Sequence, residues 1–323
     1  MKRVNRKIIE YIIPLIFVIT LNFFIPRLMP GDPFTMISDD SSGVSFTYSE
    51  EEMDKYKAYY GLDKPLYKQF FNYIKKLFKG YLGYSIYYNE NVLDIIIKRI
   101  KWTITLVIVA TIISSSLGTI FGALSAYYKN SLLDKTLYTF FITFSQIPSF
   151  LIGLIFLFYF SAYLKFFPLA GGITAFSEFN SWFDKFIDLI YHGFLPALTL
   201  SIVNMGSFYL LSRNSMLSVL TKDYIVTAKA KALKKRVIIF KHTLKNAILP
   251  IVTRIFLNFG TLIGGAVLVE NVFKYPGLGT LIREAVYVRD YPLIQGIFLF
   301  IALLVFSMNL LSDLVYKKLD PRL

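Results

Sequence analysis

The residues between Asp223 and Pro250 are the stretch of this chain whose types and spacing point most directly to a chemical task, which is recognition of another protein. Asp223 can cap a short helix, because a carboxylate is favourable at the positive end of a helix. Ile225, Ala228 and Ala232 share one face at helical spacing, and this face is small enough for a partner's groove to close around it. Pro250 suits the first turn of the next helix. We therefore expect a docking element held between two apolar segments.

The same stretch is strongly basic. Between Lys222 and Lys245 the sequence has eight Lys or Arg residues and one Asp. Basic loops are the rule on the cytoplasmic side of membranes, so an ordinary basic loop is the alternative interpretation. The formal net charge of the whole chain is +14, but its basic residues lie mostly beside apolar runs. This placement favours membrane orientation over nucleic-acid binding.

Catalytic and metal-binding chemistry has little support in the sequence. The chain has no Cys, which excludes disulfides, thiolate metal sites and a cysteine nucleophile. His192 and His242 are its only histidines and lie far apart, so we expect no catalytic residue and no metal site. No Gly-x-x-x-x-Gly-Lys-Ser/Thr run occurs, so the chain cannot cradle ATP phosphates in a P-loop. We expect no cofactor bound by this chain, and any ATP-Mg would have to be bound by another subunit.

The composition predicts a membrane protein. The chain has 323 residues, is 55% hydrophobic and has a mean hydropathy of +0.54. Several apolar runs approach or exceed the roughly 20 residues that cross a bilayer as a helix. Basic residues flank the first and last runs, at Lys2 and Arg3 and at Lys317 and Lys318. We therefore predict an all-α membrane protein with about six transmembrane helices and with both termini cytoplasmic.

The order of residues in the basic stretch indicates the protein family more specifically than the composition does. The run from Thr227 to Leu233, followed by His242, Asn246-Ala247 and Leu249-Pro250, resembles the "EAA" coupling loop of ABC-importer permeases, and in particular of the dipeptide/oligopeptide/nickel branch. Further segments are similar to that family in order and spacing: 30–33, 61–66, 80–85, 147–150 and 192–200. The resemblance covers nearly the whole chain. It implies the fold of a type I ABC-importer permease.

The resemblance also assigns residues to the contact with an ATPase. They lie on the first arm of the coupling loop and comprise Asp223, Tyr224, Thr227, Ala228, Lys231, Ala232 and Leu233. The family usually has Gly where this chain has Ala232. Alanine keeps the position small but loses the freedom to turn that glycine would have.

The predicted organisation follows from the apolar runs and the resemblance together. A first transmembrane helix (1–29) is followed by an extracytoplasmic segment (30–99), a permease core (100–316) and a cytoplasmic tail (317–323). The core spans are predicted at about 102–127, 133–163, 193–212, 248–269 and 293–314. The cytoplasmic coupling loop occupies 221–250 within the core.

The transport path is predicted from polar groups inside the spans. Gln146 and Pro148 lie near the middle of the third span, where neighbouring helices or a wet cavity must satisfy them. Pro148 marks either a simple helix kink or a bend that lines the path. The expected lining offers hydrogen-bonding groups without a cluster of charges, and comprises Ser114, Gln146, Pro148, Ser149, Asn204 and Asn258. Aromatic residues between Tyr59 and Tyr73 either bind substrate or pack short helices on the membrane.

The resemblance implies a permease subunit of an ATP-driven importer in the cytoplasmic membrane, moving short peptides by alternating access. Its expected partners are a second homologous permease, two cytoplasmic ATPase subunits and an extracytoplasmic solute-binding protein. Nickel or other metal chelates and oligosaccharides are the alternative cargoes. A stand-alone channel or secondary transporter is the alternative of another class, and such proteins usually carry acidic residues or repeats at the membrane midplane. A membrane scaffold without transport would leave the ordered coupling loop unexplained.

Overall fold

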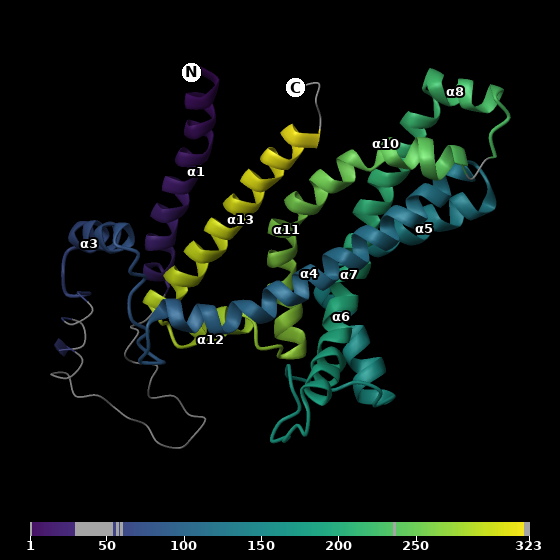
Figure 1. The fold of residues 1–323 in the computed structure, drawn as a ribbon. Helices are drawn as coiled ribbons and strands as arrows, with labels where there is room; N and C mark the ends of the chain where they lie inside the picture. Colours follow the sequence, from purple (N-terminus) through teal and green to yellow (C-terminus); the bar gives the residue numbers. More distant parts are fainter. Residues whose placement is uncertain (1, 30–53, 56–57, 59–60, 235–236, 320–323) are drawn as a thin grey trace. The chain divides into compact units, whose positions relative to one another are not determined.

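The computed structural model describes residues 2–29, 54–55, 58, 61–234 and 237–319 (Figure 1). Within these ranges the regular structure is helical, apart from one isolated antiparallel bridge between Tyr84 and Asn91. The principal helices are α1 (Lys2–Arg27), α3 (Leu66–Phe78), α4 (Val92–Tyr127), α5 (Leu132–Gln146), α6 (Ser149–Phe156), η2 (Leu157–Tyr163), α7 (Trp182–Leu220), α8 (Asp223–Ala230), η3 (Ile238–Leu244), α10 (Lys245–Ala247), α11 (Leu249–Phe273), α12 (Leu278–Tyr287) and α13 (Tyr291–Leu319).

The chain divides into two compact units. Unit 1 comprises Met1–Lys101 and Thr280–Phe306, and unit 2 comprises Trp102–Gly279 and Ser307–Leu323. The divisions fall inside α4, α12 and α13.

Several helices are long and apolar enough to cross a membrane. Four pass by length and composition, at Val92–Tyr127, Trp182–Leu220, Lys245–Phe273 and Tyr291–Val315. A fifth is obtained if α5 and the helical run 149–163 form one broken span, and α1 contributes a shorter apolar stretch, Ile12–Arg27. The prediction of a mainly helical, multi-pass membrane protein is therefore confirmed. The count of six spans stays a prediction.

The third predicted span is not a simply kinked helix. α5 ends at Gln146 and α6 begins at Ser149, and the axis of α5 differs by 98° from that of the helical run 149–163. Proline has no backbone N–H and disfavours helical backbone in the residue before it, so Pro148 ends one helix and begins the next. Ile147 accordingly has extended backbone angles. The kink interpretation is wrong at this point, because the chain turns through a right angle.

Small residues bring α4 and α7 close together in unit 2. A Cβ atom added at Gly118 would lie 2.7 Å from the Cβ of Phe208 on α7. A Cβ atom at Gly122 would collide with the backbone carbonyl of Tyr209 and lie 2.7 Å from the Cβ of Ser212. The four-residue spacing of these glycines therefore marks a backbone-to-backbone contact between the two helices.

Unit 1 contains a buried carboxylate at the start of α13. Asp290 is fully buried and accepts hydrogen bonds from the Ser85 hydroxyl at 2.5 Å, the Tyr87 N–H at 3.0 Å and the Leu293 N–H at 3.1 Å. The bond to Leu293 satisfies an N–H that the first turn of the helix would leave without a partner. Burial raises the pKa of Asp290 above its ordinary value, although these donors oppose the shift. Asp290 thus fixes the loop around Ser85 to the beginning of α13.

Candidate coupling site

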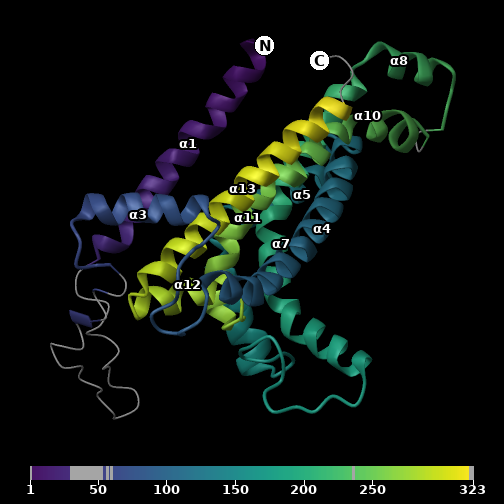
Figure 2. The same ribbon diagram turned by 60° about the vertical axis from the view of Figure 1, so that its left-hand side comes forward.

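The first arm of the predicted coupling loop is a short helix, α8, which follows directly on the end of α7 in unit 2 (Figures 1 and 2). Asp223 occupies its first turn, where a negative charge is favoured by the helix dipole. The Ile225 N–H donates to the carbonyl of Lys222 at 2.9 Å, and the Thr227 hydroxyl donates to the carbonyl of Asp223 at 3.0 Å. The predicted short helix is present, but Asp223 is its first residue rather than its cap.

The face assigned to a partner's groove is turned toward the chain itself. Ile225 and Ala228 are 0% and 6% exposed, and they form a buried cluster with Ile238 of η3, the returning arm of the loop. Val219 and Leu220, at the end of α7, pack against this cluster. The expectation that Ile225 and Ala228 share a docking face with Ala232 is therefore wrong, because only Ala232 of the three is exposed. Helical periodicity identifies an apolar face but not its partner, and here the partner is the second arm of the same loop.

The other coupling residues assigned by resemblance are accessible. Asp223, Tyr224, Thr227, Lys231, Ala232 and Leu233 are all exposed, and only Ala228 of the set is buried. Tyr224, Thr227 and Lys231 follow the i, i+3, i+7 spacing of one helix side. A protein that contacts α8 would meet these side chains and the exposed Val226 rather than the Ala228 face.

α8 ends in a turn for which alanine is an unusual residue. Ala232 has a φ of +54°, in the left-handed region. The Leu233 N–H donates to the carbonyl of Ala228 at 3.4 Å, which is the six-to-one bond of a Schellman motif with Ala232 at the C′ position. Glycine is the usual residue there, because an L side chain is strained at positive φ. The departure from the family pattern thus falls on the residue that makes the bend.

We predict that Ala232→Gly stabilises this turn. The strain of alanine in the left-handed region is on the order of 1 kcal/mol, and part of the gain is offset by the greater freedom of glycine in the unfolded chain. The variant should unfold at the same or a higher temperature than the parent and should keep full transport. Ala230→Gly is the matched control, since Ala230 lies in the last turn of α8 and the same substitution costs roughly 1 kcal/mol in a helix. A lower stability of Ala232→Gly than of Ala230→Gly in thermal unfolding would contradict this assignment.

The returning arm of the loop, η3 with α10, packs against the ends of α4 and α7. Ile239 of η3 and Ala247 of α10 are buried with Met216 of α7 and with Ala123 and Ala126 of α4. The cluster therefore joins three segments that are distant in sequence. His242 belongs to η3, but its side chain lies outside the described residues.

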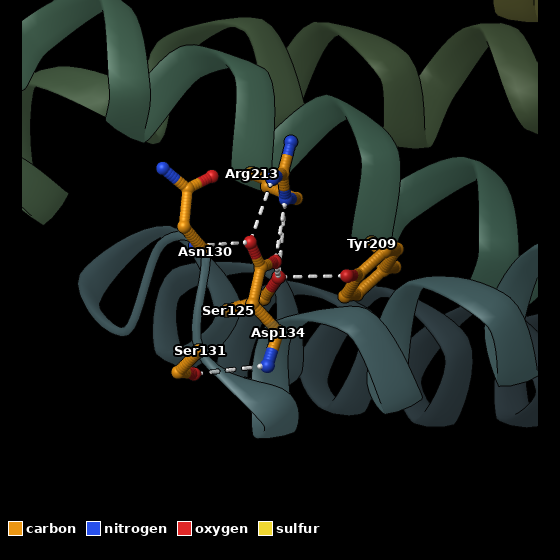
Figure 3. Close-up of polar contacts among 6 residues, drawn as sticks. All are labelled: Ser125, Asn130, Ser131, Asp134, Tyr209 and Arg213. Carbon is orange, nitrogen blue, oxygen red and sulfur yellow. Dashed lines mark hydrogen bonds and ion pairs between the residues drawn. The ribbon is translucent and has the colours of Figure 1, made fainter.

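A buried ion pair lies at the same end of unit 2, and the sequence reasoning missed it (Figure 3). Arg213 of α7 donates from Nε to Oδ1 of Asp134 on α5 and from a terminal nitrogen to Oδ2, both at 2.9 Å. This two-pronged geometry is the strongest form of the Arg–carboxylate interaction. The side chains of Arg213 and Asp134 are only 17% and 5% exposed. The sequence does carry one indication of this ion pair, which is opposite charges at the ends of two predicted spans. Asp134 lies at the start of one span, and Arg213 follows the end of another.

Further groups complete the network around Asp134. The Ser125 hydroxyl of α4 donates to Asp134 and lies 2.7 Å from the hydroxyl of Tyr209 on α7. The backbone N–H of Asn130 donates to Oδ2 at 2.9 Å, and Ser131 caps α5 by accepting from the Asp134 N–H at 3.2 Å (Figure 3). The carboxylate thus ties together α4, the 128–131 turn, α5 and α7. Because α7 continues from Arg213 to Leu220 and then into α8, this network fixes the base of the loop.

The predicted path residues occupy different environments. Asn258 of α11 is buried and donates to the side-chain carbonyl of Asn204 on α7 at 3.3 Å, so the structure brings these two together. Ser114 is fully buried and donates to the carbonyl of Thr111 within α4. The other three lie at the α5–α6 turn, where Gln146 and Pro148 are exposed and Ser149 is half-buried. Their role as a path lining stays a prediction.

Gly277 and Gly279 lie against a buried carboxylate. Glu270 of α11 is fully buried and accepts from the Thr103 hydroxyl at 2.7 Å and from the Gly279 N–H at 2.6 Å. A Cβ atom at Gly277 would collide with the Glu270 carboxylate, and one at Gly279 would lie 2.5 Å from the Cα of Val267. The glycines are needed because the loop closes around this side chain.

Comparison with known proteins gives the family context. The family model described as "Binding-protein-dependent transport system inner membrane component" matches residues 118–323, and the model for the N-terminal part of such membrane components matches residues 1–107. The oligopeptide transport system permease protein AppB of Bacillus subtilis is 37% identical over 314 residues, covering 96% of each chain. The dipeptide transport system permease protein DppB of Escherichia coli K12 is 34% identical over 329 residues, covering 97% of this chain and 96% of the relative. A putative peptide permease protein of Brucella suis is 38% identical over 304 residues, covering 94% of this chain and 92% of the relative.

A solved structure shows the same fold. A chain of the methionine ABC transporter MetNI, in inward-facing conformations, superposes with a TM-score of 0.58 at 15% sequence identity. The match covers 71% of this chain and 97% of the MetNI chain. The fold predicted for the core is therefore found in an ABC transporter.

Proposed function

The chain belongs to the family of binding-protein-dependent transport system inner membrane components, and we propose that it is the permease subunit of an ATP-driven importer of short peptides. The observation that carries the proposal is the similarity to permeases named for peptide, oligopeptide and dipeptide transport. These relatives are 34–38% identical and match over nearly their whole length. A shared cargo class is the simplest consequence of similarity that extends through both the N-terminal part and the core.

In the proposed importer, subunits other than this chain hydrolyse ATP. The sequence contains no P-loop, so energy has to arrive through contact with another protein. The exposed side of α8, with Tyr224, Thr227 and Lys231, is the proposed contact with an ATPase. Two cytoplasmic ATPase subunits, a second homologous permease and an extracytoplasmic solute-binding protein would complete the importer.

The proposed mechanism is alternating access. Closure of the ATPase pair on ATP would move α8, and its packing on Ile238, Val219 and Leu220 would transmit the motion into α7. In this arrangement the protein has six spans with both ends cytoplasmic, α1 being the first and the broken α5–α6 segment the third. Asn204 and Asn258, joined between α7 and α11, would offer uncharged hydrogen-bonding groups to a peptide backbone.

Peptide uptake by the assembled transporter tests the proposal. Proteoliposomes containing this chain and its partner subunits should accumulate labelled di- to hexapeptides only when ATP and the binding protein are both present. A nickel chelate and an oligosaccharide serve as the competing cargoes in the same assay. Uptake of either of these without peptide uptake would overturn the cargo and leave the importer intact. Solute flux without ATP would instead support a channel or secondary transporter.

A further inference from the structure

The helix α3 carries an apolar side that its own unit covers only in part. Its sequence is Leu-Tyr-Lys-Gln-Phe-Phe-Asn-Tyr-Ile-Lys-Lys-Leu-Phe, and it contains three lysines and no acidic residue. At about 100° per residue the aromatic and aliphatic side chains gather on one half of the helix and the Lys, Gln and Asn side chains on the other. Such a helix is strongly amphipathic, although none of its residues is buried.

One edge of the apolar side fixes α3 to the C-terminal part of α1, which α3 crosses (Figure 2). The ring of Phe23 on α1 meets the rings of Phe70 and Tyr73 at centroid distances of 5.2 and 5.6 Å. On the polar side Arg27 donates from Nε to the side-chain carbonyl of Gln69 at 3.0 Å. These contacts set the rotation of α3 about its own axis, so the direction of its remaining apolar side chains is determined.

The rest of the apolar side is uncovered. Tyr67, Phe71 and Phe78 are 60%, 69% and 90% exposed, and they lie within a narrow sector of the helix. Large aromatic side chains grouped in this way mark a surface that contacts something other than water.

The same surface continues onto α1. Phe24 is partly exposed and stacks on Phe70 with a centroid distance of 6.2 Å, and Phe70 contacts Phe71 at 6.2 Å. Leu28, one turn beyond Phe24, is 79% exposed. In a membrane protein an exposed apolar stripe along a spanning helix meets the acyl chains of lipids, and the aromatic contacts extend that stripe onto α3. This continuity favours lipid as the occupant of the uncovered side.

The charges beside the aromatic row fit a lipid headgroup. Lys75 and Lys68 follow Phe71 around the helix toward the polar side, and both are exposed. An interfacial helix has this arrangement, with aromatic residues at the acyl boundary and lysines at the phosphates. Each lysine near an anionic leaflet adds attraction, whereas an acidic residue would oppose it.

We propose that α3 lies in the extracytoplasmic interface of the bilayer, with Tyr67, Phe71 and Phe78 at the acyl boundary and with Lys68 and Lys75 bound to the phosphates of anionic phospholipids. The helix then anchors the segment between α1 and α4 to the membrane surface. This inference rests on the proposed topology, in which α1 crosses the bilayer and the segment after it lies outside, and it does not depend on the cargo or on ATP.

The test uses fluorescence quenching by lipids. Because the chain has no Cys, Phe71→Cys and Asn72→Cys each give a single site for an environment-sensitive fluorophore. The two residues are neighbours, but Asn72 lies on the polar side and is the matched control. The full chain, with the subunits that purify with it, is placed in nanodiscs containing phosphatidylcholine, phosphatidylglycerol and a lipid spin-labelled near the headgroup. We expect quenching at position 71 several-fold stronger than at position 72, and protection of position 71 from aqueous iodide.

A further variant tests the role of the lysines, and the quenching measurements distinguish lipid from a covering protein. Lys68→Glu with Lys75→Glu should remove the additional quenching that phosphatidylglycerol produces over phosphatidylcholine alone. Equal quenching at positions 71 and 72 would overturn the proposal. Protection of position 71 from iodide without lipid quenching would also overturn it, because a protein would then cover the aromatic row. Unchanged phosphatidylglycerol dependence in the double variant would overturn the role of the lysines.

Discussion

Replacing Arg213 with alanine is expected to destabilise the protein by about 3–5 kcal/mol, because the substitution leaves the Asp134 carboxylate buried without its charge partner. Asp134 would lose both bonds of 2.9 Å from the guanidinium, while its side chain stays only 5% exposed. The loss should appear as a lower unfolding temperature in detergent and as a smaller yield of monodisperse protein. Uptake should fall as well, since α7 carries both Arg213 and the attachment of the coupling loop.

Two comparison variants make this result specific. Lys98→Ala removes an ion pair with Glu90 whose side chains are 65% and 42% exposed, and such surface pairs contribute at most about 1 kcal/mol. The double variant Asp134→Asn/Arg213→Met leaves no buried charge and should recover much of the stability lost in Arg213→Ala. An unfolding temperature of Arg213→Ala equal to that of Lys98→Ala would show that the network contributes little.

Ala228→Arg is expected to abolish uptake by loosening α8 from the rest of the chain. Ala228 is packed against Ile225 and Ile238, so a long charged side chain costs on the order of 1–3 kcal/mol in overpacking before its buried charge is counted. The variant should still insert into the membrane, because α8 lies outside the candidate spans. Limited proteolysis with chymotrypsin, which cleaves beside aromatic residues such as Tyr224, should cut the variant faster than the parent.

Ala230→Arg is the matched control for this prediction. Ala230 is exposed and lies two residues further along the same helix, on the side opposite Ala228. The same substitution there should leave the rate of cleavage at Tyr224 unchanged, whatever it does to contact with a partner. Equal protease sensitivity of the two variants, or normal uptake by Ala228→Arg, would contradict the packing described for α8.

Local sequence signals predicted much of the helical organisation. Asp223 begins α8, Pro250 lies in the first turn of α11, and Pro148 lies at the break between α5 and α6. These positions could be predicted because each residue affects the helix boundary through its own backbone or its nearest neighbours in the sequence. The angle at Pro148 could not be predicted in this way, because α6 packs against α7 and α11 and no local pattern specifies those contacts. The spacing of Gly118 and Gly122 likewise permits close helix packing but does not identify α7 as the partner.

The candidate site was predicted less completely for the same reason. The resemblance located the coupling loop, but the orientation of Ala228 depends on Ile238, which is reached only after the chain turns back at Ala232. The pair of Asp134 and Arg213 joins residues 79 positions apart, and no local pattern specifies that contact. Local sequence patterns therefore predict the helix α8 but specify neither the residues that it packs on nor the ion pair that fixes its base.

Co-purification from native membranes tests the central claim most directly. A tagged form of this chain, extracted in mild detergent, should bring down a second permease and an ATPase whose nucleotide-binding motifs this chain lacks. ATP hydrolysis in the purified complex should depend on that ATPase and rise when the binding protein is added with peptide. Recovery of the folded chain without either partner would contradict its role as the permease of an ATP-driven importer.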